Sequence, residues 1–311
     1  MAVELKGRNF VTIRDFIPEE IEQILDTADM LKLQQKMRMP HPLLPGRTLG
    51  MIFQKPSLRT RVSFEVGMNQ LGGHALVLQP TEIKLGERET VEDVAKVLSR
   101  YVDAIMARTF GHDIVEELAR HARVPVINGL SDAAHPCQIL ADLMTIREKK
   151  GRLAGLSVAW IGDGNNVATS LAFGCARCGV DLRVATPKGY ELPPAVLDRA
   201  RQDARTTGAS ITTTTDPFAA AEGADVLYTD VWASMGQEGE AERRKRDFAG
   251  FQVNRALLER AASDAIVLHC LPAHYDEEIT YDVATDPHSA IFDQAENRLH
   301  AQKALLALIV P

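Results

Sequence analysis

Residues 53–65, with the sequence F-Q-K-P-S-L-R-T-R-V-S-F-E, have the residue types of an anion-binding site. Pro56 and Ser57 are residues that begin helices, so Arg59 and Arg61 are expected in the first helical turn. The helix dipole disfavours cations there, whereas a bound anion would reverse this penalty, because helix N-termini present free N–H groups and a positive potential. We therefore expect a phosphate group to bind at this turn; an ordinary exposed basic turn is the alternative.

Polar side chains that could bind a ligand follow most of the predicted strands, where open parallel sheets place their ligands. They are Ser57, Arg59, Thr60, Arg108, His135, Gln138, Asn166, Asp230, Ser234, Cys270 and Arg298. Each has an ordinary structural alternative, since a lone His135 is more often a structural residue and Asp230 could cap a turn. Together, the first half of the chain offers cations and hydroxyls for a phosphorylated ligand, and the second half offers a carboxylate, an amide, a hydroxyl and a thiol.

Short apolar runs alternate with amphipathic segments along the chain, which predicts βαβ units and parallel sheets. Strands are expected at residues 48–53, 75–78, 104–106, 124–127, 156–161, 182–185, 210–214, 226–229, 265–269 and 291–292. Helices are expected at 17–36, 90–101, 114–121, 195–206 and 294–309, and also after Ser57, before Lys150 and before Cys178, with a loop at 79–89. The predicted fold is α/β, with two doubly wound domains, each with a central mainly parallel sheet flanked by helices.

Composition excludes several classes of protein. The net charge of -7 argues against a general nucleic-acid binder and fits an enzyme whose cationic site is local. The N-terminal sequence M-A-V-E-L-K-G-R-N-F has no apolar signal core, and the longest apolar run, residues 304–310, is too short to span a bilayer. We expect a cytoplasmic protein with neither nucleic-acid nor membrane partners.

Neither a metal nor a nucleotide cofactor is expected. Cys175 and Cys178 have the spacing of a metal or redox pair, but no second pair completes a zinc site, so packing inside a helix is the better interpretation. The turn Gly162-Asp163-Gly164 has Val167 where a dinucleotide fingerprint needs its third glycine, and the chain has no phosphate-binding P-loop sequence.

Five motifs, in order and at suitable spacing, resemble those of the ornithine carbamoyltransferases. They are S-L-R-T-R (57–61), H-P-C-Q (135–138), D-V-W-A-S-M-G (230–236), H-C-L-P (269–272) and E-N-R-L-H-A-Q-K (296–303). The first two are similar in all carbamoyltransferases, while the third and fourth point to the ornithine branch. The resemblance implies a carbamoyl-phosphate-binding domain at 1–150 with a closing C-terminal helix at 294–311, an ornithine-binding domain at 151–293, and a homotrimer or an assembly of trimers.

The resemblance also implies a role for each matching residue. Carbamoyl phosphate would be bound by Ser57, Leu58, Arg59, Thr60, Lys84, Arg108, His135, Gln138, Cys270, Leu271 and Arg298. Ornithine would be bound by Asn166, Asp230, Ser234 and Met235, and the catalytic residues would be Arg108, His135, Asp230 and Cys270. Two positions depart from the family pattern: Leu58 stands where threonine is common, and Lys84 stands where glutamine is frequent.

The implied reaction transfers the carbamoyl group of carbamoyl phosphate to the δ-amine of L-ornithine, giving L-citrulline and phosphate. Cys270 is not expected to be a covalent nucleophile, because the attacking amine already belongs to the substrate. A carbamoyltransferase for putrescine or N-acetylornithine is one alternative, and a non-catalytic binding relative is another. Asp230 favours a free α-amino acid, because a carboxylate suits an α-ammonium group. The sequence leaves open whether the reaction serves arginine synthesis or arginine breakdown.

Overall fold

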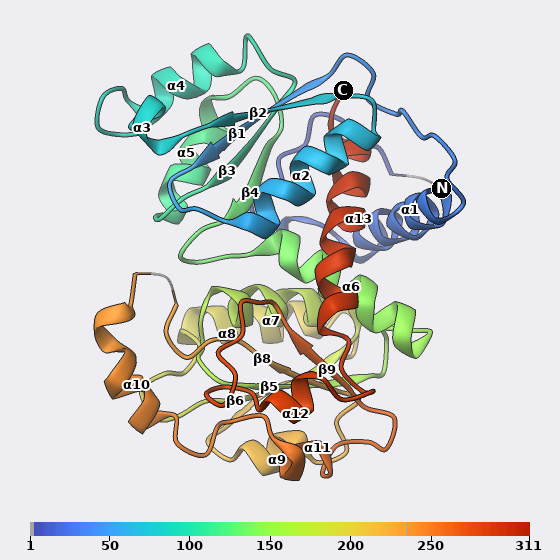
Figure 1. The fold of residues 1–311 in the computed structure, drawn as a ribbon, viewed down its shortest axis with the longest axis vertical. Helices are drawn as coiled ribbons and strands as arrows, with labels where there is room; N and C mark the ends of the chain where they lie inside the picture. Colours follow the sequence, from blue (N-terminus) through green and yellow to red (C-terminus); the bar gives the residue numbers. More distant parts are fainter. Residues whose placement is uncertain (1–2, 235) are drawn as a thin grey trace. The chain divides into compact units, whose positions relative to one another are not determined.

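The computed structural model describes residues 3–234 and 236–311, which divide into two compact units. The first unit comprises Met1–Met144 and Glu296–Pro311, and the second comprises Thr145–Ala295. Each unit has one parallel sheet with helices around it, as Figure 1 shows. In neither described range does a helix have the length and apolar character that crossing a membrane requires.

The sheet of the first unit has the strand order β2-β1-β3-β4, and all neighbouring strands are parallel. Its strands are β1 (Thr48–Phe53), β2 (His74–Leu78), β3 (Ala104–Arg108) and β4 (Val126–Leu130). The register pairs Phe53 with Arg108 at the carboxyl ends of β1 and β3. The N–H of Gln54 then donates to the carbonyl of Arg108 over 2.8 Å, so the chain passes Arg108 on its way to Ser57.

Helices connect and cover these strands. They are α1 (Pro18–Lys36), α2 (Leu58–Gln70), α3 (Pro80–Ile83), α4 (Val91–Leu98) and α5 (His112–His121), with parts of α6 (Pro136–Lys150) and α13 (Ile291–Ile309). Val94 of α4 and Val115 of α5 share one buried cluster with Ile52 and Ile105 of the sheet. The apolar residues of these helices lie about one turn apart, which is why the helices pack on the sheet along one side.

The sheet of the second unit has the strand order β7-β6-β5-β8-β9 and is also parallel throughout. Its strands are β5 (Ser157–Ile161), β6 (Asp181–Ala185), β7 (Ile211–Thr214), β8 (Val226–Thr229) and β9 (Ile266–His269). Its helices are α7 (Asn166–Cys178), α8 (Pro194–Ala204), α9 (Pro217–Ala221), α10 (Ala241–Asp247), α11 (Arg255–Leu258) and α12 (Tyr281–Ala284). Figure 1 shows α7 and α8 on one face of this sheet and α9 and α11 on the other.

The structure confirms the predicted α/β fold and nearly all of its strands, two of them with unchanged ends. The strand expected at 291–292 is wrong, because these residues form the first turn of α13. Ala290 donates its N–H to Val267 of β9, and the helix begins immediately afterwards, with Ile291 buried and Phe292 exposed. The segment 79–89, expected to be a loop, contains the single-turn helix α3. Cys175 is buried within α7, in agreement with its packing interpretation.

Candidate active site

The N-terminus of α2 has the capped geometry that its sequence predicts. Ser57 is the N-cap residue, and its hydroxyl oxygen accepts a hydrogen bond from the N–H of Thr60 over 3.3 Å. The hydroxyl of Ser57 also donates to the hydroxyl of Thr60 over 3.1 Å. Leu58 is exposed and Arg59 is half-buried. The first N–H groups of a helix have no partner inside it, so this turn can offer both backbone donors and cationic side chains to an anion.

Arg298 of α13 joins three of the motifs in the first unit. Its guanidinium donates to the amide oxygen of Gln138 over 2.8 Å and to the hydroxyl of Thr60 over 3.2 Å. Gln138 in turn donates its amide N–H to Asp142 over 2.8 Å. All of these side chains are buried, so the hydrogen bonds are shielded from water and their geometry is well defined. The structure therefore brings Ser57, Thr60, Gln138 and Arg298 together.

Arg108 and Arg298 both lie close enough to His135 for their charges to act on its imidazole. Arg108 ends β3 and is buried, and His135 lies directly before α6 and is also buried. Burial holds the pKa of His135 well below its usual range, and the positive charges of Arg298 and then Arg108 lower the pKa further. His135 is therefore a neutral imidazole at pH 7, which can donate an N–H hydrogen bond but carries no charge.

Lys84 also belongs to the first unit, in the segment between β2 and α4. It follows α3, has a left-handed backbone with φ of 41°, and its side chain is exposed. Its N–H donates to the carbonyl of Pro80 over 2.9 Å, which closes the short helical turn. Across residues 3–234 and 236–311, no hydrogen bond or ion pair joins its ammonium group to Ser57 or Thr60.

In the second unit, Asp230 binds two of its neighbours through its carboxylate. Asp230 follows β8 and is buried. Its Oδ1 accepts from the thiol of Cys270 over 2.9 Å, and its Oδ2 accepts from the amide of Asn165 over 2.8 Å. Asn165 also caps α7, because its side-chain oxygen accepts from the N–H groups of Val167 and Ala168. Asn165 is thus a candidate site residue that the sequence prediction missed in favour of the adjacent, half-buried Asn166.

A buried histidine–glutamate pair holds the loop that carries Cys270 and Leu271. Nε2 of His269 lies 2.9 Å from the carboxylate of Glu278, and both side chains are inaccessible to solvent. Nδ1 of His269 lies 2.9 Å from the N–H of Leu271. Because a backbone N–H can only donate, Nδ1 is the acceptor and Nε2 carries the proton. Leu271 has a left-handed backbone with φ of 59°, and this hydrogen bond holds it there.

The loop after Asp230 holds the remaining predicted ornithine ligands. Ser234 is half-buried, and its N–H donates to the side chain of Gln237 over 3.0 Å. Met235 lies outside the described residues. The structure therefore gives a position for Ser234, whose carbonyl also accepts from the N–H of Gln237 over 2.9 Å.

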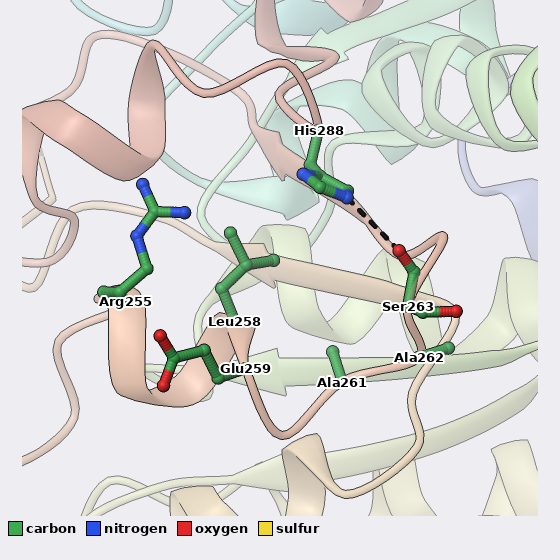
Figure 2. Close-up of a pocket in the computed structure, with 7 residues that line it drawn as sticks. All are labelled: Arg255, Leu258, Glu259, Ala261, Ala262, Ser263 and His288. Carbon is green, nitrogen blue, oxygen red and sulfur yellow. Dashed lines mark hydrogen bonds between the residues drawn. The ribbon is translucent and has the colours of Figure 1, made fainter.

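Two other features of the second unit are candidates for ligand binding. Donor atoms of Asp230, His269 and Cys270 lie within 4.8 Å of one another, but both ring nitrogens of His269 already have partners, so the group does not fit a metal ion. Figure 2 shows a pocket lined by residues of α11 and its following segment and by His288, whose ring lies 3.3 Å from the carbonyl of Ser263. This pocket adjoins the amino end of β9, the opposite end from Cys270, and contains no predicted site residue.

Two models of one family match most of the chain. Residues 8–148 match the carbamoyl-P binding domain of aspartate/ornithine carbamoyltransferase, and residues 154–309 match its Asp/Orn binding domain. This chain belongs to the aspartate/ornithine carbamoyltransferase family. The resemblance that the five motifs indicated is confirmed, and the protein is a transferase.

Individual relatives are similar along their whole length. The chain is 57% identical to an ornithine carbamoyltransferase of Pyrococcus abyssi and to an anabolic ornithine carbamoyltransferase of Pyrococcus furiosus, across 100% of this chain and 98% of each relative. The solved structure of an ornithine carbamoyltransferase from Pyrococcus furiosus superimposes with a TM-score of 0.97 at 57% identity, covering 99% of both chains. That from Thermus thermophilus gives a TM-score of 0.87 at 49% identity, covering 97% of this chain and 99% of the other.

Proposed function

We propose that this chain is an ornithine carbamoyltransferase, which converts carbamoyl phosphate and L-ornithine into L-citrulline and phosphate. The observation that carries the proposal is identity of 57% over the whole chain with relatives of that name. One relative is named anabolic, which supports a role in arginine biosynthesis. In this proposal, residues 1–150 with the closing helix 294–311 bind carbamoyl phosphate, and residues 151–293 bind ornithine.

The phosphate end of carbamoyl phosphate is assigned to the N-terminus of α2. The phosphate carries about two negative charges, which Arg59 and the backbone N–H groups near Leu58 can bind through charge-assisted hydrogen bonds. The hydroxyls of Ser57 and Thr60 add neutral donors, and they are already oriented by the helix cap. Arg298 reaches the same turn through Thr60.

The carbamoyl end is assigned to Arg108, His135 and Gln138, with Cys270 and Leu271 from the second unit. Negative charge develops on the carbonyl oxygen as the tetrahedral centre forms, and preorganised donors stabilise this charge. Arg108 offers a cation, and the neutral imidazole of His135 offers an N–H donor. Gln138 is held by Arg298 and Asp142, so its amide has a fixed orientation.

Ornithine is assigned to the loops after β5, β8 and β9. The carboxylate of Asp230 suits the α-ammonium group of a free amino acid, and Asn166, Ser234 and Met235 complete the proposed set. The attacking δ-amine must be neutral, and an amine with a pKa of about 10.4 is neutral in only about one molecule in 2,500 at pH 7. We assign the selection and orientation of that amine to Cys270, and the hydrogen bond from its thiol to Asp230 supports this assignment.

In the chemical step the amine adds to the carbamoyl carbon, and the tetrahedral centre then expels phosphate. The δ-nitrogen forms a bond to the carbamoyl carbon, the bond from that carbon to the phosphate oxygen breaks, and the departing phosphate accepts a proton from the amine. Holding both reactants in one orientation can contribute several kcal/mol to the rate acceleration. No residue of the protein forms a covalent bond to the substrate in this scheme.

The proposal extends to assembly and location. We assign a homotrimer or an assembly of trimers in the cytoplasm, with Lys84 serving the site of a neighbouring subunit. Its side chain is exposed, and its ammonium group has no hydrogen bond or ion pair with a described residue, which is compatible with this role. As a lysine it would act on an anion as a point charge.

The lysine at position 84 also favours a second candidate, a carbamoyltransferase for putrescine or N-acetylornithine.

The experiment that tests the main proposal is incubation of the purified protein with carbamoyl phosphate and L-ornithine, with citrulline and phosphate both measured. We expect the two products in equal amounts. Phosphate without citrulline would contradict the transfer reaction.

A further inference from the structure

Arg244 of α10 differs from the cations around it. Of the four cations at residues 243–246, all within the described part of the chain, only Arg244 is buried. The side chains of Arg243 and Lys245 are 56% and 43% exposed, whereas that of Arg244 is 7% exposed. Burying a guanidinium is unfavourable unless its N–H groups find acceptors, so its partners explain its position.

The guanidinium of Arg244 bonds three acceptors from three parts of the second unit. Nη1 donates to the carboxylate of Asp163 over 2.8 Å and to the backbone carbonyl of Trp232 over 2.8 Å. Nε donates to the carboxylate of Glu240 over 3.0 Å. The guanidinium carbon also lies 5.0 Å from the ring centroid of Tyr190. A planar fork of donors is suited to such simultaneous contacts, which an ammonium group cannot reproduce.

These contacts connect the turn after β5 with the loop after β8. Asp163 and Asn165 both belong to that turn, and they hold the loop at two points. Asn165 bonds the side chain of Asp230 directly, while Asp163 acts through Arg244 on the carbonyl of Trp232, two residues further along. Trp232 is buried and stacks on Phe248 with ring centroids 5.7 Å apart.

Arg244 also stabilises the ionised carboxylate of Asp163. Burial raises the pKa of Asp163, and the charge and hydrogen bond of Arg244 oppose that shift. Without the guanidinium, a buried carboxylate would lack its cation and the carbonyl of Trp232 would lose this donor. Leaving buried polar groups without partners typically destabilises a local structure more than removing both partners does.

From this geometry we infer that Arg244 is a positioning residue for ornithine: by fixing the backbone at Trp232, it sets the placement of Asp230 and Ser234. Arg244 itself does not touch the substrate. The inference rests on the proposed function, because it concerns the loop assigned to ornithine. It predicts a selective effect on ornithine, because the contacts of Arg244 described above are made within the second unit, whereas the residues assigned to the phosphate belong to the first.

The kinetic test compares Arg244→Gln with Arg246→Gln, the same substitution at an exposed position of the same helix. We expect Arg244→Gln to raise the KM for ornithine by about tenfold or more while the KM for carbamoyl phosphate stays within about twofold. Arg246→Gln should match the wild-type protein in both. Equal increases in both KM values, or an ornithine KM within about twofold of wild type, would overturn the inference.

A second variant covers the case in which Arg244→Gln does not fold. Arg244→Lys keeps the charge but loses the planar fork of donors, so we expect it to fold. Its KM for ornithine should exceed that of the wild-type protein, but by less than the increase of about tenfold expected for Arg244→Gln. An Arg244→Lys protein with wild-type values for both substrates would show that the fork is dispensable and would overturn the inference.

A substrate-independent measurement separates this inference from the proposed function. The chain has two tryptophans, so Trp160→Phe leaves Trp232 as the single tryptophan. Because Nε1 of Trp160 donates to the backbone carbonyl of Asp163 over 2.9 Å, the Trp160→Phe protein itself is the reference for every further variant. In that background we expect Arg244→Gln, but not Arg246→Gln, to increase acrylamide quenching of Trp232, because the loop is no longer held. Unchanged quenching would overturn the positioning role. Absence of citrulline formation by the wild-type protein would overturn the proposed function alone.

Discussion

The guanidinium of Arg298 lies 2.8 Å from the amide oxygen of Gln138, although 160 positions separate the two residues in the chain. The same guanidinium reaches the hydroxyl of Thr60, 238 positions away. The closing helix therefore contributes directly to the proposed carbamoyl-phosphate site, in addition to its packing. A buried cation that bonds two candidate ligands couples the orientation of both.

Replacement of this cation should impair the use of carbamoyl phosphate. We expect Arg298→Gln to lower kcat/KM for carbamoyl phosphate by about a hundredfold, which corresponds to about 2.7 kcal/mol of lost transition-state stabilisation. Steady-state kinetics measure this change. Glu296→Gln, at an exposed position of the same helix, is the control and should retain wild-type values. A comparable loss in both variants would indicate general damage to the helix instead.

The two arginines at the start of α2 should differ sharply in importance. Arg61 pairs with Glu65 across one helical turn over 3.2 Å, while the side chain of Arg59 forms no hydrogen bond or ion pair with any described residue. We expect Arg59→Ala to reduce turnover by about a thousandfold or more with an almost unchanged melting temperature, because its proposed partner is the phosphate. Arg61→Ala should remain active. Near-normal activity of Arg59→Ala would remove it from the proposed site.

The hydrogen bond between Cys270 and Asp230 predicts how substitution of Cys270 changes kcat/KM for ornithine. Cys270→Ser keeps a donor for the carboxylate of Asp230, whereas Cys270→Ala removes it, so we expect about tenfold lower kcat/KM for ornithine in the serine variant and a larger loss in the alanine variant. Mass spectrometry of the wild-type protein with carbamoyl phosphate alone should show no carbamoylated cysteine. A thioester on Cys270 would contradict direct attack of the substrate amine on carbamoyl phosphate.

The buried ammonium group of Lys303 should make the free energy of unfolding depend on pH. Its ammonium lies 2.9 Å from the amide oxygen of Gln35 and 2.8 Å from that of Gln70, and burial lowers its pKa to about 8. In the unfolded chain its pKa is about 10.4, so between these values the unfolded state binds more protons and the free energy of unfolding rises with pH.

Urea unfolding of wild type and Lys303→Met isolates this contribution. We expect the stability advantage of the wild-type protein over Lys303→Met to grow between about pH 8 and about pH 10, since methionine does not titrate. Lys36→Met, at the exposed end of α1, should show no such trend. A wild-type advantage that stays constant or shrinks over this window would contradict the lowered pKa of Lys303.

Features with local causes could be predicted from the sequence. The N-cap at Ser57 depends on residues three positions apart, and the strands β1 and β8 are short apolar runs bounded by polar residues. The prediction of a strand at 291–292 is wrong because the apolar run there is too short to distinguish a strand from a helix. Two apolar residues carry no periodicity. Only the fold shows that the chain contacts β9 at Ala290, through the carbonyl of Val267, and then continues as a helix.

Partners far apart in the chain could not be predicted from spacing. Asn165 and Asn166 are chemically identical neighbours, and only the fold shows that Asn165 is the one that reaches Asp230. Arg244 stands in a run of cations whose composition indicates a solvated helix, and its burial follows from acceptors 81 and 12 positions away. Periodicity identifies which face of a helix is apolar, but it does not identify which charged side chain is drawn inward by distant acceptors.

The choice of amine is the central claim, and kcat/KM for L-ornithine, putrescine, N-acetylornithine and L-aspartate at saturating carbamoyl phosphate tests it most directly. Asp230 as a partner for an α-ammonium group predicts that ornithine exceeds each of the others by about a hundredfold or more. A higher value for putrescine or N-acetylornithine would contradict the ornithine assignment and leave the phosphate site intact. No turnover with any amine, from folded protein, would contradict the proposed function as a whole.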